Sequence, residues 1–134
     1  MSYRKLLHWF RQLDVWLIVP AIALVTWGEL AQAPLPEELE IAVWDKALHF
    51  TAYFGLALMT TIAVRADRRS LWWALALVVM GGALEVVQGL TGRDMDVFDE
   101  VANTLGVLAG LGLAWAVITA LKARKLVEDP PPPD

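Results

Sequence analysis

Long apolar stretches alternate with short polar connections along the whole chain. Four stretches are long enough to cross a bilayer as helices, which takes about 20 residues. They cover approximately residues 14–31, 46–65, 70–90 and 99–121. The connections between them are short, which favours an antiparallel up-and-down arrangement. The pattern therefore predicts an all-α fold, an integral membrane bundle of four antiparallel helices, and we expect Pro20 to kink the first of them.

Basic residues are unevenly distributed between the two ends of this predicted bundle. Nine of the eleven lie before the first stretch, between the second and third, or after the fourth, and only Lys46 and Arg93 lie at the opposite end. Lysine and arginine accumulate on the cytoplasmic side of membrane proteins, so both termini are predicted to be cytoplasmic. A soluble helical bundle with a very apolar core is the competing interpretation, and it leaves the asymmetry unexplained.

Composition supports this picture and narrows the function. The 134 residues are 57% hydrophobic, and their number suits a single domain, which we place at residues 1–126, followed by a disordered proline-rich tail at 127–134. The chain has no cysteine, which excludes disulfides and thiolate metal sites. Its formal net charge of −4 is mild, so we expect the lipid bilayer as a partner and no nucleic acid.

Polar residues that interrupt the apolar stretches gather at the end with few basic residues. Asp45, His49 and Tyr53 are spaced by four, so they share one face of a helix. Asp99, Asn103, Gly106 and Gly110 follow at steps of four, three and four and also share a face. Glycines spaced by four permit close approach of a neighbouring helix. We therefore expect the polar faces to point at each other rather than at lipid.

Ionisable groups of this kind suit acid–base chemistry, with histidine as the natural base or proton shuttle. The candidate catalytic residues are Asp45, His49, Glu85, Asp96 and Asp99. The candidate substrate-binding residues are Lys46, Gln88, Arg93, Asn103 and Tyr53. Asp94 and Glu100 are interpreted as solvated loop charges. We assign no metal ligands, although one histidine with several carboxylates suits Mg²⁺, Mn²⁺ or Ca²⁺ better than structural zinc and leaves a divalent cation as a candidate cofactor.

Two motifs in this region resemble those of the VanZ-like membrane proteins. The first is Asp45-Lys46-x-x-His49-Phe50-x-x-Tyr53-x-x-Leu56. The second begins with Glu85-x-x-Gln88 and continues as Arg93-x-x-Asp96-x-x-Asp99-x-x-x-Asn103-x-x-Gly106. Together they span about residues 44–110, most of the chain. The resemblance implies a multi-pass protein of the bacterial cytoplasmic membrane and a site in this region, but it implies no particular reaction and no role in antibiotic resistance.

Three functions are compatible with the polar cluster. The first is an enzyme on the extracytoplasmic face that acts on a lipid-linked or other envelope molecule without a serine or cysteine nucleophile. The second is an accessory protein that binds such a ligand without changing it. The third is an ion-pair and hydrogen-bond network that only holds helix ends in register. An excess of acids over bases at this end favours the first two, because a structural network more often balances its charges.

Overall fold

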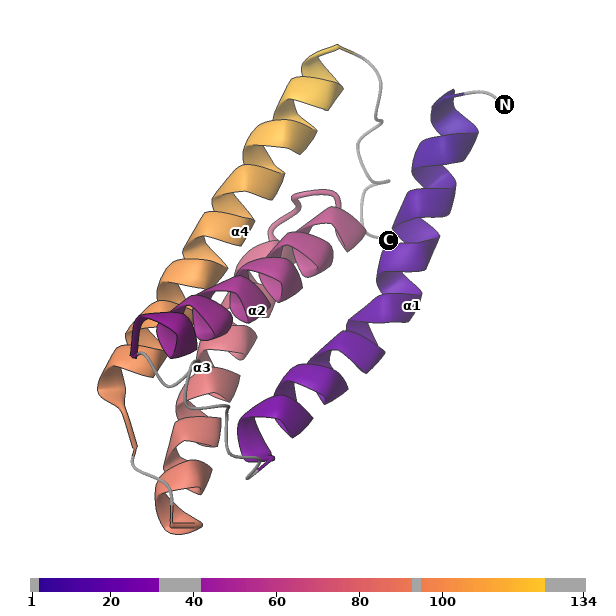
Figure 1. Ribbon diagram of the computed structural model, residues 1–134. Coiled ribbons are helices and arrows are strands. Elements are labelled where there is room, and N and C mark those ends of the chain that lie inside the picture. The colour runs from indigo at the N-terminus through magenta and orange to yellow at the C-terminus, as the bar shows by residue number, and fades with distance from the viewer. Residues whose placement is uncertain (1–2, 32–41, 93–94, 125–134) are drawn as a thin grey trace.

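Four α-helices make up the fold in the part of the chain that the structure describes, which is residues 3–31, 42–92 and 95–124. In this computed structural model they are α1 (Tyr3–Leu30), α2 (Ala42–Ala63), α3 (Arg69–Leu90) and α4 (Val97–Ala123). Consecutive helices run in opposite directions, so that α2 and α4 are parallel to each other (Figure 1). The prediction of an all-α, four-helix fold is confirmed. The predicted tail at 127–134 lies outside the described residues.

Local sequence explains where two of the helices begin and bend. Helix α1 begins at Tyr3 rather than near Asp14, because the polar residues before the apolar stretch continue the helix. It contains Pro20, which has no N–H to donate, and Figure 1 shows its axis bending partway along. Helix α4 begins after Asp96, whose side chain accepts a hydrogen bond of 2.8 Å from the backbone N–H of Phe98.

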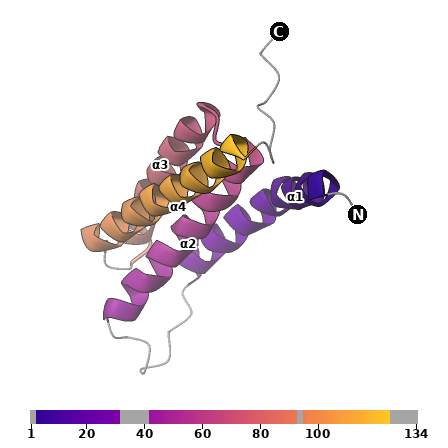
Figure 2. The same ribbon diagram turned by 90° about the horizontal axis from the view of Figure 1, so that it is seen from above.

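Helices α2 and α4 have the most extensive contact in the bundle, and both views show them side by side (Figures 1 and 2). Glycine makes this contact possible. A Cβ atom at Gly106 would collide with the backbone carbonyl of Phe50, and one at Gly110 would collide with that of Phe54. The close approach expected from the glycine spacing is thereby confirmed, with backbone of α2 packed directly on α4.

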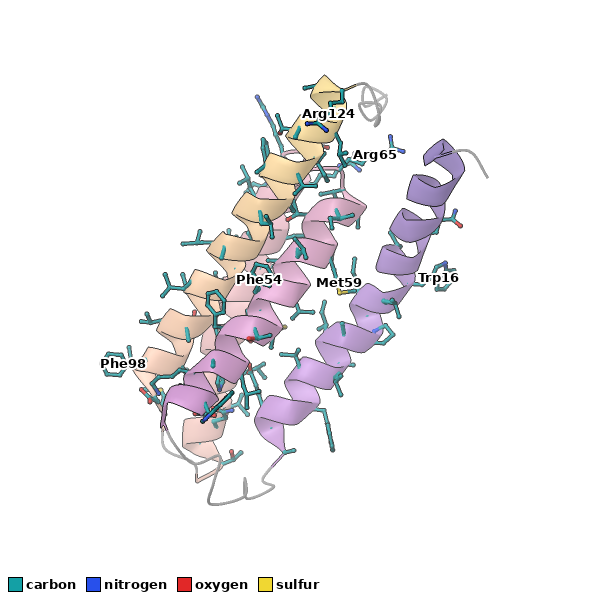
Figure 3. All side chains as sticks on the ribbon, turned by 45° about the horizontal axis from the view of Figure 1, so that its top comes forward. Trp16, Phe54, Met59, Arg65, Phe98 and Arg124 are labelled. Atoms are coloured by element: carbon teal, nitrogen blue, oxygen red, sulfur yellow. The ribbon has the colours of Figure 1, made fainter. Side chains whose placement is uncertain are left out.

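A small core lies between the helices, and much apolar surface lies outside it. The core consists of Tyr53, Leu56, Ala57, Leu77 and Val107, with side chains of α1 packed against it. Figure 3 shows Trp16 and Phe98 pointing away from the bundle, and both are more than two-thirds exposed, at 78% and 69%. Arg65 and Arg124 lie together at one end of the bundle (Figure 3).

By length and hydropathy, two helices qualify as membrane spans among the described residues. They are α3, Arg69–Leu90, and α4, Val97–Ala123, and α1 adds a shorter apolar stretch at Val15–Leu30. Only 33% of the apolar window of α3 and 28% of that of α4 are buried within the chain. The core helix of a soluble protein would be mostly buried, whereas most of the surface of these two helices is not covered by the described residues.

The α2–α4 contact yields a test of stability. We expect Gly106→Ala and Gly110→Ala each to lower the free energy of unfolding by about 1–3 kcal/mol, because the added methyl group meets backbone that cannot rotate away. Thermal unfolding of the purified protein in detergent measures the change. Gly112→Ala is the matched control in the same helix, since nothing lies within 4 Å of its added Cβ. Equal melting temperatures for Gly106→Ala and Gly112→Ala would contradict the close contact.

Candidate functional site

A polar cluster forms where α2 and α4 begin and α1 and α3 end. Every helix contributes to it: Glu29 from α1, Asp45, Lys46 and His49 from α2, Glu85 from α3, and Asp96, Asp99 and Asn103 from the start of α4. Because α2 and α4 are parallel and packed through glycine, residues spaced by four on one helix face residues spaced by four on the other. The cluster is thus a direct consequence of the helix contact described above.

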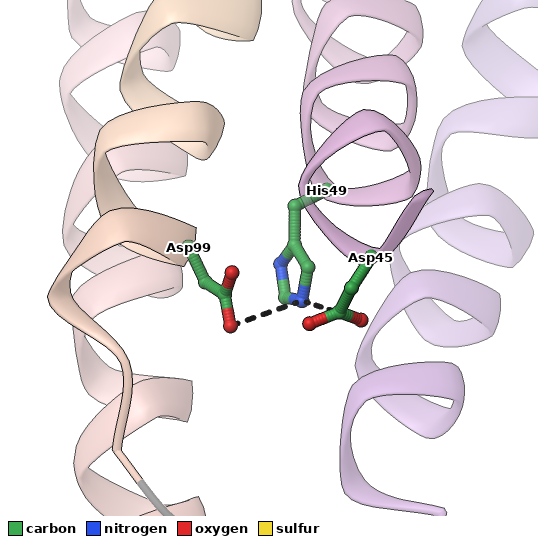
Figure 4. Close-up of side chains that lie close together, drawn as sticks. All are labelled: Asp45, His49 and Asp99. Atoms are coloured by element: carbon green, nitrogen blue, oxygen red, sulfur yellow. Dashed lines mark ion pairs between the residues drawn. The ribbon is translucent and has the colours of Figure 1, made fainter. Parts of the chain in front are cut away.

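His49 lies at the centre of the cluster and is only 9% exposed. Its Nδ1 atom is 3.1 Å from the Oδ1 atom of Asn103, a hydrogen-bond distance. Its Nε2 atom lies between two carboxylates, 4.0 Å from Asp45 Oδ1 and 3.9 Å from Asp99 Oδ2 (Figure 4). Both distances exceed hydrogen-bond length. The Nδ1 atom of the imidazole is therefore within hydrogen-bond distance of Asn103, and the Nε2 atom points into the gap between the two carboxylates.

A neighbouring carboxylate determines how this imidazole is oriented. Asn103 Nδ2 donates to Glu100 Oε2 at 3.4 Å, so the amide nitrogen faces Glu100. The amide oxygen of Asn103 then faces His49 and requires a proton on Nδ1. In the neutral imidazole, the lone pair consequently lies on Nε2, in the gap between Asp45 and Asp99.

Lys46 joins α2 to the start of α4. Its ammonium donates to Asp96 Oδ2 at 2.6 Å and to Asp99 Oδ1 at 2.9 Å. Hydrogen bonds from Lys46, and then from the backbone N–H of Phe98, hold the pKa of Asp96 below its ordinary value of 3.8. Asp96 therefore stays ionised while it caps α4 and binds Lys46. This arrangement makes Asp96 a residue that positions the helix as well as part of the cluster.

Helix α3 contributes a buried acid, Glu85, and only one of its two carboxylate oxygens has a hydrogen-bond partner among the described residues. Glu85 is 4% exposed, and its Oε2 atom accepts a hydrogen bond of 3.2 Å from the backbone N–H of Asp96. Its Oε1 atom is buried and has no hydrogen-bond partner among the described residues. Gln88, one turn further on, turns to α1 instead, where its side-chain amide donates to the backbone carbonyl of Glu29 at 2.7 Å.

The contribution of α1 is the part of the cluster that the sequence analysis missed. The side chain of Glu29 is 9% exposed, and its Oε1 atom lies 3.6 Å from His49 Nδ1. The available signal was an acid near the end of an apolar stretch, next to Gly28. An acid at the end of an apolar helix is usually interpreted as a solvated terminus, and only the packing of α1 against α2 turns it inward.

The structure places the remaining residues named in the sequence analysis in different surroundings. Tyr53 is fully buried, and its hydroxyl interacts electrostatically with Glu29 rather than bonding to His49. Arg93 and Asp94 lie outside the described residues. The interpretation of Glu100 as a solvated charge was wrong, because its carboxylate binds Asn103 and Thr104 and lies where a Cβ atom of Gly81 would be.

The cluster also has the donors that a metal ion requires. Asp45, His49 and Asp99 each offer one ligand atom, and these three atoms lie within 4.8 Å of one another. An imidazole with a free lone pair and two carboxylates can accept a proton, hold a cation or stabilise a positively charged ligand.

The family assignment agrees with the two sequence motifs. The VanZ/LLP1 family model matches residues 3–119, a range that contains every member of the cluster from Glu29 to Asn103. No curated protein and no solved structure matches the chain. The resemblance noted in the sequence is confirmed, and the chain belongs to the VanZ/LLP1 family.

Proposed function

We propose that this chain is a multi-pass protein of the bacterial cytoplasmic membrane whose polar cluster is an acid–base site on the extracytoplasmic face. Its substrate would be a lipid-linked or other cell-envelope molecule whose polar head reaches the cluster from the membrane surface. The observation that carries the proposal is the position of His49, with one nitrogen held by Asn103 and the other directed between Asp45 and Asp99.

The outer surface of the bundle supports a membrane location. Large apolar side chains such as Val19, Trp72 and Leu90 are 73%, 72% and 81% exposed, and they lie on two different helices, α1 and α3. Leaving that much apolar surface in water is unfavourable by about 25 cal/mol per Å². Lipid chains remove this penalty without a partner protein, and α2 can cross with its polar face covered by the other helices.

The distribution of charge supports the sidedness. The cluster lies at the end where α2 and α4 begin, whereas Arg65, Arg68 and Arg69 lie at the other end, where α2 ends and α3 begins. Lys122 and Arg124 also lie at that other end, where α4 finishes. Under the positive-inside rule, the basic end is cytoplasmic and the acidic cluster is extracytoplasmic.

His49 and its neighbours fit a proton-transfer role. The lone pair on Nε2 can take a proton from a substrate or a water molecule, and the two carboxylates then stabilise the imidazolium. Asn103 keeps the ring in the required tautomer, as the third member of a catalytic triad does for its histidine. The ammonium of Lys46, held by two carboxylates at the rim, offers positive charge to an anionic head group.

Nucleophilic catalysis by a hydroxyl is not favoured by this arrangement. The chain has two serines, Ser2 and Ser70, and Ser70 lies at the opposite end, where its hydroxyl accepts from Trp115. Thr91 is close in sequence, but its hydroxyl donates to the backbone carbonyls of Val87 and Gln88. Water activated by His49, or one of the carboxylates, is therefore the proposed nucleophile.

Sidedness can be tested by labelling, because the chain contains no cysteine of its own. We expect Thr91→Cys to react with a membrane-impermeant maleimide in intact spheroplasts, and Arg68→Cys to react only after permeabilisation. Both positions are exposed at helix ends, so they differ only in the side of the bilayer they face. Reaction of both cysteines from the same side would rule out the proposed topology.

Activity can be tested on the purified protein in lipid nanodiscs that contain total envelope lipids. We expect the wild type to convert one lipid-linked component, detected by mass spectrometry. His49→Gln should lose at least about 100-fold of this activity, the usual size of a general-base contribution. Asp45→Asn, Glu85→Gln and Asp99→Asn should each lose a substantial part of it. Asp67→Asn, at the opposite end of the bundle, is the matched control.

The outcomes separate the three functions. Saturable retention of an unchanged lipid by the wild type would indicate an accessory binding protein. If every variant melts far below the wild type while Asp67→Asn does not, the cluster is a structural network. Normal melting combined with lost conversion supports the acid–base proposal.

A further inference from the structure

The geometry points to a divalent-cation site formed by Asp45 Oδ1, His49 Nε2 and Asp99 Oδ2. The inference deepens the proposed function and rests on it, because it names what the same cluster binds. A hard to borderline ion of the Mn²⁺ type is the chemical class that these donors fit. The site carries three protein ligands and leaves the remaining coordination positions to water or to an anionic substrate group.

The spacing of the donors suits a bridging ion better than direct hydrogen bonds. His49 Nε2 is 4.0 Å from Asp45 Oδ1 and 3.9 Å from Asp99 Oδ2, with all three atoms within 4.8 Å. An ion bound at about 2.0–2.3 Å from each donor holds neighbouring donors roughly 3–3.6 Å apart, so the two contacts to His49 need to shorten by about 0.3–1 Å. The ligand atoms of the two aspartates, which lie within 4.8 Å of each other, have to close by about 1–2 Å at most. Figure 4 shows the imidazole edge and both carboxylates converging on one gap.

The hydrogen bonds around His49 prepare it as a ligand. Metal-binding histidines almost always donate their second N–H to a carbonyl or carboxylate oxygen, which fixes the tautomer and aims the free lone pair. His49 donates Nδ1–H to Asn103 Oδ1, and Glu100 in turn holds the Asn103 amide. In the neutral imidazole, these hydrogen bonds place the lone pair on Nε2, on the side that faces the two aspartates.

Lys46 does not compete with the ion for the same atoms. Its ammonium binds Asp99 through Oδ1, whereas the Oδ2 atom of Asp99 is the one that faces His49. Asp99 can therefore accept from Lys46 and ligate a cation at the same time. Asp45, with 33% of its side chain exposed, lies on the side from which an ion would enter.

A separate observation also points to a missing positive charge or donor. Glu85 is 96% buried, and its Oε1 atom has no hydrogen-bond partner among the described residues. Its Oε2 atom accepts from the backbone N–H of Asp96, so the carboxylate lies beside the start of α4, three residues before Asp99. A buried carboxylate oxygen without a donor is costly. A cation between Asp45, His49 and Asp99, with its coordinated water, would supply what Glu85 lacks.

Mn²⁺ itself is the probe, because it is paramagnetic. The full-length protein, stripped with EDTA and reconstituted in nanodiscs, should bind one equivalent of Mn²⁺. The electron spin-echo modulation of the bound Mn²⁺ should show coupling to one imidazole nitrogen. His49→Gln should abolish this coupling. Asp45→Asn and Asp99→Asn should weaken Mn²⁺ affinity at least about tenfold, which even the loss of an outer-shell partner typically does.

The chain offers matched controls for each substitution. It has only one other histidine, so His8→Gln should leave the imidazole coupling intact. Asp67→Asn repeats the change of carboxylate to amide at the opposite end and should leave the affinity unchanged. Wild-type protein that binds no Mn²⁺, or binds it without imidazole coupling, would overturn the inference whether or not any variant folds. Coupling that persists in His49→Gln would overturn it as well.

Failure of this inference is distinguishable from failure of the proposed function. If His49→Gln loses lipid conversion but wild-type protein binds no Mn²⁺ at an imidazole, the cation is excluded and the acid–base site remains. If Mn²⁺ is coupled to His49 but the four cluster variants convert lipid as the wild type does, the cation site stands and the acid–base function is excluded.

Discussion

The close approach of α2 to α4 is the constraint on which the rest of the structure depends. Gly106 and Gly110 let the backbone of Phe50 and Phe54 pack directly on α4, which no larger residue would allow. The two helices are parallel, so contacts between them continue toward their N-termini. His49 directly precedes Phe50 and reaches Asn103, which lies about one turn before Gly106. About one turn earlier on both helices, Lys46 reaches Asp99.

Charge is the second constraint, because this helix contact gathers more acids than bases. Among the described residues, Glu29, Glu85 and Asp99 are largely buried around His49, whereas Lys46 is the nearby cation and is already bonded to two aspartates. Ionisable groups within a bilayer cost about 2.5–3.5 kcal/mol each at mid-depth and less near the surface. In the membrane location proposed above, a position at the helix ends limits this cost, and a bound cation would offset more of it.

The acidic residues of the cluster have two kinds of role: some hold parts of the structure in place, and others are directed at His49. Asp96 caps α4 and binds Lys46, and Glu85 accepts from the backbone N–H of Asp96, so both hold the start of α4 in place. Glu100 acts through Asn103 on the orientation of His49. Asp45 and the Oδ2 atom of Asp99 remain directed at the imidazole without a hydrogen bond to it. These are the atoms that both proposals use.

The sequence by itself determined the class of fold, the family and most members of the cluster. Apolar length and short connections specify four antiparallel helices, and spacing by four specifies which residues share a helix face, because both depend only on local geometry. Tertiary structure alone decided that Glu29 and Glu100 turn inward, that Asn103 rather than a carboxylate bonds to His49, and which oxygen of Asp99 faces which partner. These contacts depend on the distance and rotation between helices far apart in sequence, and helical periodicity does not determine either of them.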